Sequence, residues 1–370
     1  MTTKIINVCG ARPNFMKIAP LMDAYKEFPE LEPIIVHTGQ HYDEKMSDLF
    51  FRQLGIPEPD INLGVGSASH AQQTAKIMEA FEPVVLEYKP DYVLVVGDVN
   101  STIACALVAT KLGVKVIHVE AGLRSFDRAM PEEINRILTD TISDLLFVSE
   151  ESGVVNLRKE GVDESRIHFV GNVMIDTLMK HRARAEQTDV LDKLNLKPKQ
   201  YGLITLHRPS NVDNAEKLSS ILEGLGEISE ELVLLFAMHP RTRKNIEQFE
   251  LSDLLASFPN IRLTEPFGYL EFLKLMANAK VVLTDSGGMQ EETTILGTAC
   301  LTLRENTERP STITDGTNKL VNPSREEIVQ AWNDLKANPP QTDNKPKLWD
   351  GQAAKRIAKI IVQDAKEKDS

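Results

Sequence analysis

The segment 284–292 combines residue types that suit a phosphorylated sugar as ligand. An apolar run, Val281–Leu283, predicts a buried strand that passes through two glycines directly into a helix. The glycines let a ligand approach the backbone closely, and a helix N-terminus carries about half a positive charge, which favours a phosphate. An ordinary glycine-marked turn would give the same pattern, so the segment alone leaves both interpretations open. The residues that we predict to contact a ligand here are Ser286, Gly287, Gly288, Gln290 and Glu292.

A second candidate phosphate contact follows the first expected strand, at Gly10–Lys17. Gly10 suits a tight turn, Arg12 is a bidentate phosphate donor, and Lys17 falls within the first turn of the expected helix. The segment lacks the Gly-x-Gly-x-x-Gly fingerprint, which argues against a standard NAD-binding domain. A solvated helix entry is the alternative interpretation of both cations.

Carboxylates follow neighbouring strands in the first half of the chain. Asp98 follows the third expected strand, Glu120 ends the fourth, and Glu132 follows Pro131 at a helix start. Such residues often serve only as helix caps or as partners of the helix dipole, but the end of an apolar strand is unfavourable for an idle carboxylate. Crowded carboxylates raise one another's pKa, which suits them to proton transfer. One acidic catalytic pocket is therefore our hypothesis.

Cations occupy the corresponding positions in the second half. His207 and Arg208 follow one expected strand, His239 and Arg241 follow the next, and Arg309 follows the last clear strand. A lone histidine is usually structural or solvated, whereas histidine–arginine pairs at the ends of neighbouring strands suit a pyrophosphate or another leaving group. The histidines and carboxylates lack close ligand spacing, so the sequence predicts no zinc or di-metal site.

Strands and helices alternate almost throughout, as expected of two arrays of parallel strands covered by helices. We expect strands near Ile5–Cys9, Ile34–His37, Tyr92–Val96, Val114–Val119, Leu145–Val148, Ile167–Val170, Leu203–Leu206, Leu232–Ala237, Ile261–Leu263, Val281–Leu283 and Cys300–Leu303. The expected helices are Phe15–Phe28, Ala71–Glu87, Ser101–Leu112, Glu132–Ile142, Ala215–Ile228, Tyr269–Ala277, Met289–Leu296 and Arg325–Lys336. The predicted fold is α/β, with two doubly wound Rossmann-like domains and the ligand between their strand ends.

The two arrays are separated by the charged, loop-like segment Arg182–Gln200. We place an N-terminal domain at 1–172 and a C-terminal domain at 173–350. The last expected helix, Gly351–Lys368, carries apolar residues at helical spacing. We assign it to the N-terminal domain, although capping of the C-terminal domain fits the sequence nearly as well.

Bulk properties restrict the class of protein. The chain has 370 residues, enough for two domains of ordinary size, and 42% hydrophobic and 26% charged residues, as in soluble globular proteins. A formal net charge of -12 argues against nucleic-acid and anionic-membrane partners. We see neither a signal peptide nor a membrane span, and Cys9, Cys105 and Cys300 fit reduced core thiols, so we expect a cytoplasmic protein.

Taken together, these motifs resemble the non-hydrolysing UDP-N-acetylglucosamine 2-epimerases over essentially the whole chain. The resemblance implies the GT-B fold, with the active site in the interdomain cleft and UDP held mainly by the second domain. It also implies conversion of UDP-N-acetylglucosamine (UDP-GlcNAc) to UDP-N-acetylmannosamine (UDP-ManNAc) without a redox cofactor, in a homodimer. The segments that carry it are Gly10–Lys17, Gly97–Thr102, His118–Ser125, Pro131–Arg136, His207–Asn211, Thr284–Glu292, Asn306–Pro310 and Trp349–Ala354.

In this family UDP is eliminated to give a 2-acetamidoglucal and is then added back with C2 inverted. By resemblance, Asp98, Glu120 and Glu132 act on the sugar side, and His207 serves both catalysis and the UDP. Which carboxylate removes the proton does not follow from spacing. The resemblance further assigns contacts with UDP or substrate to Arg12, Lys17, Arg136, Arg208, Ser286, Gly287, Gly288, Gln290, Glu292 and Arg309.

The chain departs from the family pattern at several positions. Asn14 stands where many members have Glu, and Pro209-Ser210-Asn211 stands where many have Arg-Glu-Asn. Many bacterial members bind a second UDP-GlcNAc as an activator; of the residues that serve it, Gln40 and His41 remain, whereas Asp43 and the stretch 67–69 differ. These departures argue against allosteric activation and leave a related UDP-2-acetamido sugar open as the substrate.

Three rival functions share parts of this pattern. A hydrolysing epimerase would release free UDP together with the sugar. A GT-B glycosyltransferase would need an acceptor, and a non-catalytic nucleotide-sugar sensor would not require so many carboxylates. Deuterium incorporation at C2 separates an epimerase from a glycosyltransferase and from a sensor. Accumulation of free UDP identifies the hydrolysing epimerase.

Overall fold

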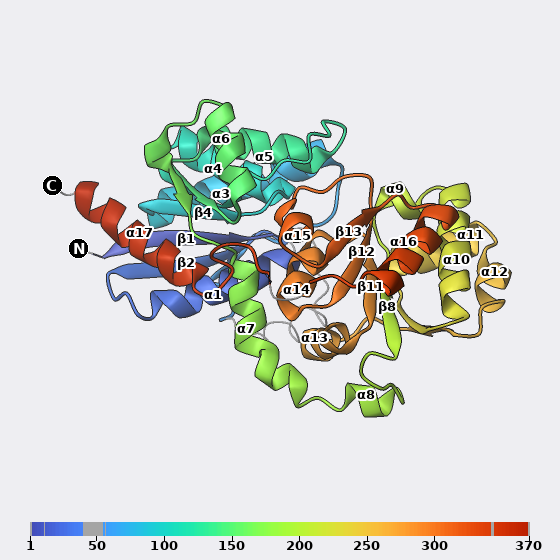
Figure 1. Ribbon diagram of the computed structural model, residues 1–370. Coiled ribbons are helices and arrows are strands. Elements are labelled where there is room, and N and C mark those ends of the chain that lie inside the picture. Colours follow the sequence, from blue (N-terminus) through green and yellow to red (C-terminus); the bar gives the residue numbers. More distant parts are fainter. Residues whose placement is uncertain (1, 11, 40–54, 56, 342–343, 369–370) are drawn as a thin grey trace. The chain divides into compact units, whose positions relative to one another are not determined.

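The computed structural model describes the chain except residues 1, 11, 40–54, 56, 342–343 and 369–370 (Figure 1). Gln40, His41 and Asp43, on which the argument against an activator site depends, lie outside the described residues. The chain divides into two compact units, unit 1 (Met1–Lys180 with Lys347–Ser370) and unit 2 (His181–Pro346).

Unit 1 is built on a parallel sheet of seven strands in the order β3-β2-β1-β4-β5-β6-β7. Helices α3, α4 and α5 pack side by side, and α17 packs on α1 (Figure 1). The strands are β1 (Thr3–Cys9), β2 (Leu31–His37), β3 (Ile61–Asn62), β4 (Tyr92–Val96), β5 (Lys115–Ala121), β6 (Leu145–Val148) and β7 (Ile167–Phe169). The helices are α1 (Arg12–Tyr25), α3 (His70–Tyr88), α4 (Asn100–Lys111), α5 (Pro131–Ile142), α6 (Glu151–Lys159), α7 (Val173–Glu186), which continues into unit 2, and α17 (Ala353–Lys368).

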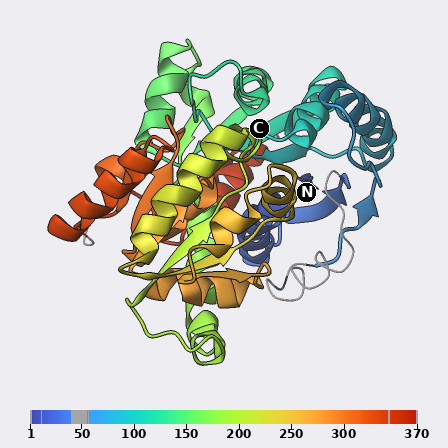
Figure 2. The ribbon, with the colours of Figure 1, turned by 90° about the vertical axis from the view of Figure 1, so that its right-hand side faces the viewer.

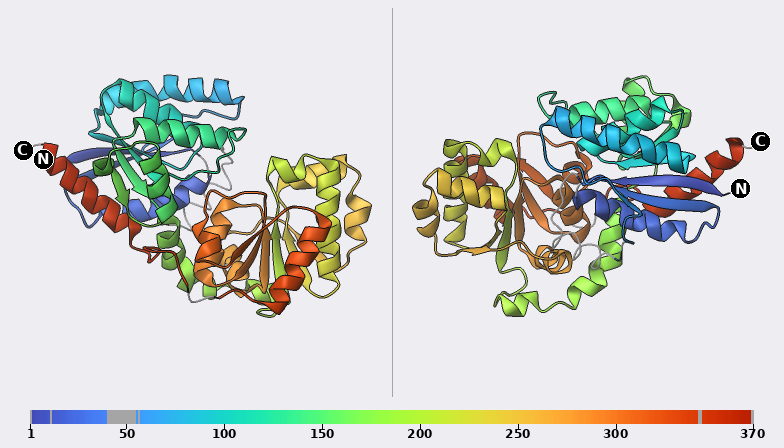
Figure 3. Two further views of the ribbon diagram at one scale, coloured as in Figure 1. Left: turned by 45° about the horizontal axis from the view of Figure 1, so that its top comes forward. Right: turned by 180° about the vertical axis from the view of Figure 1, so that it is seen from behind.

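Unit 2 repeats this plan with a parallel sheet of six strands in the order β10-β9-β8-β11-β12-β13 (Figures 2 and 3). Helix α10 packs on α12 and α16, while α13 packs on α14. The strands are β8 (Tyr201–Thr205), β9 (Val233–Ala237), β10 (Ile261–Thr264), β11 (Val281–Thr284), β12 (Ala299–Leu303) and β13 (Asn318–Val321). The helices are α8 (Val190–Lys193), α9 (Pro209–Val212), α10 (Ala215–Ser229), α11 (Pro240–Gln248), α12 (Ser252–Ala256), α13 (Tyr269–Asn278), α14 (Gly287–Leu296), α15 (Ser311–Thr314) and α16 (Arg325–Ala337).

Both sheets have the order of a doubly wound α/β domain, in which the strand order reverses beside the first strand. The predicted fold class, two Rossmann-like domains, is therefore confirmed. In each sheet the central strands are buried on both faces, which explains why they are almost continuously apolar in the sequence. No helix among the described residues is long and apolar enough to span a membrane.

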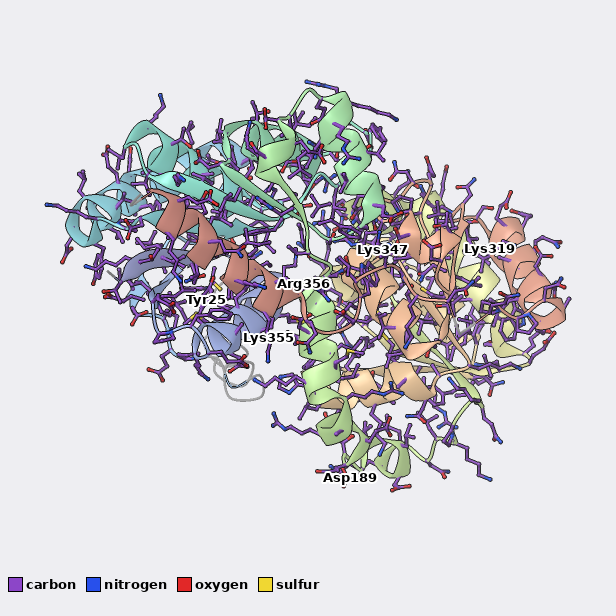
Figure 4. The ribbon with its side chains drawn as sticks, turned by 60° about the vertical axis from the view of Figure 1, so that its left-hand side comes forward. Tyr25, Asp189, Lys319, Lys347, Lys355 and Arg356 are labelled. Carbon is purple, nitrogen blue, oxygen red and sulfur yellow. The ribbon has the colours of Figure 1, made fainter. Side chains whose placement is uncertain are left out.

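The C-terminal helix α17 belongs to unit 1. It lies beside α1, where Tyr25 of α1 and Lys355 of α17 mark the two helices (Figure 4). Ile357 and Ile361 of α17 are fully buried. The apolar residues that recur at helical spacing in the sequence therefore mark the face of α17 that packs on α1.

The expected loop-like segment Arg182–Gln200 is partly helical. Helix α7 continues to Glu186, and the short helix α8 follows at Val190–Lys193. Its charged residues misled the prediction because they lie on the outer side of an amphipathic helix. The side chains that α7 buries here, at spacings of three and four, are Leu178, His181 and Ala185.

Candidate active site

The carboxyl ends of β4 and β5 meet at Gly97, the residue before Asp98. The Gly97 N–H donates to Val119 O at 3.1 Å, and its φ of 68° is one that residues with a side chain rarely adopt. A Cβ at Gly97 would lie 3.1 Å from Lys17 Nζ and 3.5 Å from Glu120 Oε2. Glycine therefore leaves room for Lys17 and Glu120 beside the chain that carries Asp98.

Lys17 and Glu120 form a buried ion pair. Their side chains are 9% and 2% exposed, and Lys17 Nζ contacts Glu120 Oε2. The other oxygen of Glu120, Oε1, is buried and has no hydrogen-bond partner among the described residues. Since buried carboxylate oxygens normally have partners, this oxygen is a candidate for contact with a substrate or for proton transfer.

The backbone of Glu120 is strained. Its φ is 71°, a left-handed conformation, and the pairing of β5 with β6 shifts register between Val119 and Ala121. For a residue with a side chain this conformation costs about 1–2 kcal/mol. Strain of this kind is concentrated at functional sites, where the surrounding structure maintains it.

Asp98 is paired with Arg136 of α5, and its side chain remains 31% exposed. Arg136 also donates to Glu133 through Nε at 3.0 Å and through Nη2 at 2.6 Å. Burial by itself raises the pKa of Glu133, but the Ser125 N–H and Arg136 outweigh it and hold the pKa below its usual range. Arg136 thus donates to both Asp98 and Glu133, and it holds the partly exposed Asp98 carboxylate in place.

Three further residues of unit 1 that the sequence analysis named are Glu132, Arg12 and Asn14. Glu132 is half-buried in the first turn of α5. The side chain of Arg12 lies outside the described residues. Asn14 accepts from the Gly10 N–H at 3.2 Å and donates to Val96 O at 3.2 Å, so it ties the end of β1 to the end of β4. An ionised glutamate at this position could not donate to Val96 O.

In unit 2, Asp285 at the end of β11 anchors the loop that carries His207. Its carboxylate accepts the backbone N–H groups of His207 and Arg208 and lies 2.9 Å from His207 Nδ1. Burial by itself raises the pKa of Asp285, but these partners outweigh it and lower the pKa. A carboxylate at Nδ1 favours the tautomer with a proton there, which leaves Nε2 of the 43% exposed His207 side chain for a ligand.

The first turn of α14 is flanked by arginines. A Cβ at Gly287 would lie 2.7 Å from Arg309 Nη1, and Arg309 Nε donates to Glu291 at 2.6 Å. Glu308 contacts Arg309 and lies 2.8 Å from Arg304 Nη2. Although burial opposes it, the arginines hold the pKa of Glu308 well below its usual value. Cations and the free N–H groups of a helix start together suit a diphosphate.

Two predicted ligand contacts of α14, Gln290 and Glu292, are buried. Gln290 donates to Ser286 O at 3.3 Å and accepts from Thr307 Oγ1 at 2.7 Å. It therefore connects the start of α14 to the segment that contains Thr307. Glu292 accepts from Tyr269 Oη at 3.2 Å. Burial raises the pKa of Glu292 to about 8, with a further contribution from Glu291.

The structure therefore brings the predicted residues together in two sets. Unit 1 holds Lys17, Asp98, Glu120 and Arg136 around Gly97. Unit 2 holds the start of α14 with its arginines, and the His207–Asp285 pair. Sequence reasoning missed Asp285 and Glu308 as anchors, although each directly precedes a predicted ligand residue. Among the described residues no group of three or more histidine, cysteine or acidic side chains could hold a metal ion.

The family model for UDP-N-acetylglucosamine 2-epimerase matches residues 23–362. The chain belongs to this family. The resemblance to UDP-N-acetylglucosamine 2-epimerases that the motifs carry is thereby confirmed, and the two doubly wound sheets agree with the GT-B fold that it implies.

Similar proteins include members with different substrates in their names. The UDP-N-acetylglucosamine 2-epimerase of Methanocaldococcus jannaschii is 44% identical, with 97% of this chain and 99% of that protein covered. The UDP-2,3-diacetamido-2,3-dideoxy-D-glucuronate 2-epimerase of Pseudomonas aeruginosa is 41% identical, with the same shares covered, 97% and 99%. The crystal structure of the Methanocaldococcus jannaschii UDP-GlcNAc 2-epimerase, in complex with UDP-GlcNAc and UDP, matches with a TM-score of 0.91 and 44% identity, covering 98% of this chain and 100% of that one.

Proposed function

We propose that this chain is a non-hydrolysing UDP-N-acetylglucosamine 2-epimerase that interconverts UDP-GlcNAc and UDP-ManNAc. The observation that carries the proposal is the buried Lys17–Glu120 pair beside Asp98 in a member of this family. Such a group of carboxylates serves proton transfer, which a nucleotide-sugar sensor does not need. The arginine-flanked start of α14 supplies the complementary requirement, a place for the diphosphate.

The chemistry needs no oxidant and no water. The C2 hydrogen of the intact sugar is not acidic, but it becomes removable as the C1–O bond to UDP breaks and positive charge develops at C1. UDP leaves with the electron pair of that bond, a carboxylate takes the C2 proton, and a C1–C2 double bond forms. The reverse steps add a proton to the opposite face of C2 and rejoin UDP to C1.

The residues divide between the two ends of the substrate. We assign Asp98, Glu120 and Glu132 to proton transfer at C2 and to the charge at C1. Unit 2 binds UDP, with Ser286, Gly287, Gly288, Arg208, His207 and Arg309 on the diphosphate and Glu292 on the ribose. Because Arg136 donates to Asp98 and Glu133, we assign it the task of holding Asp98 rather than a direct contact with UDP.

The decisive experiment is turnover of UDP-GlcNAc in D2O followed by NMR. We expect one deuterium at C2 in the product and in recovered substrate, with no growing pool of free UDP. Turnover without label would contradict proton removal at C2. Free UDP that rises in step with free sugar would instead identify a hydrolysing epimerase.

The same assay tests the sugar. A relative that is named for a 2,3-diacetamido uronic acid substrate shares 41% identity with this chain, so that substrate class is the second candidate. We expect a higher kcat/KM for UDP-GlcNAc than for the UDP-2,3-diacetamido-glucuronate. The opposite order would keep the mechanism and change the substrate.

A further inference from the structure

Glu120, the strained residue of β5, is braced from both sides by one buried carboxylate. Asp140 of α5 lies with Oδ1 2.6 Å from His118 Nδ1, two residues before Glu120. Its Oδ2 accepts the N–H of Gly122, two residues after Glu120, at 3.0 Å. His118 and Asp140 are essentially inaccessible to solvent. The Asp140 carboxylate therefore spans the bulge in which Glu120 adopts its left-handed conformation.

The hydrogen bonds of His118 define its charge. Its Nε2 lies 2.8 Å from Gly97 O, and a carbonyl oxygen can only accept. On the other side of the ring, Asp140 is an ionised acceptor, because its Oδ2 also lies 2.7 Å from Arg124 Nη1. Both ring nitrogens of His118 must then donate, which makes the side chain an imidazolium.

The charges around this pair balance within unit 1. Burial by itself raises the pKa of Asp140, but His118 and Arg124 outweigh it and the pKa lies below its usual value. Arg124 is balanced in turn by Glu160, which accepts from its Nε at 2.8 Å and its Nη2 at 2.7 Å. Removing one partner of such a buried group leaves an uncompensated charge.

The same side chain also holds the peptide that precedes the second carboxylate of the site, Asp98. Gly97, whose carbonyl it binds, directly precedes Asp98 and lies against Lys17 and Glu120. A network of three side chains, Arg124, Asp140 and His118, thus fixes the backbone on both sides of Glu120 and immediately before Asp98.

We propose that Asp140 and His118 are positioning residues of the epimerase: as a carboxylate–imidazolium pair they hold Glu120 in its strained conformation and fix the peptide that carries Asp98. The proposal rests on the proposed function. Neither residue touches the sugar, and both act through the backbone of residues that do. A misplacement of about 1 Å in such groups can reduce a rate on the order of 100-fold.

The test compares two buried aspartates of unit 1. Asp140→Asn replaces one acceptor by an N–H donor, so it cannot accept from both His118 and Gly122. Asp176→Asn is the matched control, because Asp176 is also buried and accepts two backbone N–H groups, those of Ala353 at 3.1 Å and Ala354 at 2.8 Å. We expect Asp140→Asn to lower kcat at least 100-fold, with KM and the Kd for UDP changed less than threefold. Asp176→Asn should keep kcat within threefold.

A second measurement needs no variant to retain its fold. Nitrogen-15 NMR of histidine-labelled wild-type protein should show His118 with protons on both ring nitrogens, assigned from the signal missing in His118→Gln. A neutral imidazole, or near-normal kcat in Asp140→Asn, would overturn the proposal. Equal losses of kcat in Asp140→Asn and Asp176→Asn would also overturn it, since that result indicates a merely structural role. If the wild-type protein fails to turn over a UDP-2-acetamido sugar, the proposed function fails, while the NMR result still decides the charge of His118.

Discussion

At the residue scale, two carboxylates that end neighbouring strands have different surroundings. Asp98 is partly exposed and paired with Arg136, whereas Glu120 is buried against Lys17 and keeps one oxygen without a partner among the described residues. An accessible carboxylate and a buried one suit different steps, since removal of a proton from one face of C2 and delivery to the other require groups in distinct positions.

Asp98→Asn and Glu120→Gln should therefore each remove most of the activity. Loss of a group that transfers a proton typically reduces a rate by about 100- to 10,000-fold, so we expect a fall in kcat of that order. The Kd for UDP, measured by calorimetry, should stay close to the wild-type value because the proposed function assigns the nucleotide to unit 2. Near-normal kcat in both variants would remove the two carboxylates from the chemistry.

Glu292 leads to a prediction on pH. Burial raises the pKa of Glu292 to about 8 from an ordinary value of 4.5. Between these values the unfolded chain releases the proton and the folded chain retains it, so the contribution of Glu292 to the free energy of unfolding falls as pH rises through this window.

Glu292→Gln cannot ionise, so its stability relative to wild type should increase from pH 5 to pH 8, by at most about 1.4 kcal/mol per pH unit. Denaturant unfolding of both proteins without ligand at several pH values measures the difference. A difference that does not change with pH would show that Glu292 is ionised in the folded protein throughout this range.

The sequence was sufficient to find the candidate site residues that directly follow strands. It was not sufficient to find the buried carboxylates that hold those residues in place. Asp98, Glu120 and Ser286 stand out because polar or glycine-rich residues interrupt apolar runs. Asp140 and Glu308 look like ordinary surface charges in the sequence, because a carboxylate buried by ion pairs gives the same local pattern as a solvated one. Only the tertiary contacts distinguish the two cases.

At the element scale, the central strands and long helices were predictable because buried parallel strands are apolar throughout and helices repeat every three to four residues. Short elements were not. Strand β3 has two residues, and β13 (Asn318–Val321), at the edge of its sheet, is buried only at its first and last residues. Both depend on pairing with neighbouring strands, which local sequence does not encode.

The junction between β7 and α7 shows how tightly the elements of unit 1 are packed. Gly171 has a φ of 87°, and a Cβ there would overlap Leu348 O and lie 2.9 Å from the Leu348 carbonyl carbon. Backbone atoms cannot move aside as a flexible side chain can. The segment that leads into α17 therefore passes directly against Gly171.

Gly171→Ala should destabilise unit 1 strongly. Gly161→Ala is the matched control, because Gly161 has a φ of 80° and a Cβ there would meet no described atom within 4 Å. We expect about 1–2 kcal/mol for the backbone conformation in the control and about 1–3 kcal/mol more in Gly171→Ala. Thermal and denaturant unfolding measure both; equal losses would show that Leu348 yields to the methyl group without cost.

At the scale of the whole molecule, the two units have separate hydrophobic cores, but only unit 2 is continuous in sequence. Unit 1 is completed by the last 24 residues, Lys347–Ser370. Trp349 Nε1 donates to Ser149 O at 2.8 Å, and α17 buries its apolar face on α1. The stability of unit 1 therefore depends on a segment that follows unit 2 in the chain.

Ending the chain at Pro346 should unfold unit 1 and leave unit 2 folded. Ile357 and Ile361 alone contribute about 3–6 kcal/mol by burial, which is comparable to the whole stability of many domains. We expect the truncated protein to lose epimerase turnover, to keep UDP binding within about tenfold, and to lose one of two unfolding transitions in calorimetry.

In the untruncated chain, Ile357→Ala should lower the stability of unit 1, and Lys359→Ala, on the exposed face of the same helix, should not. Turnover retained after truncation would mean that unit 1 folds without α17.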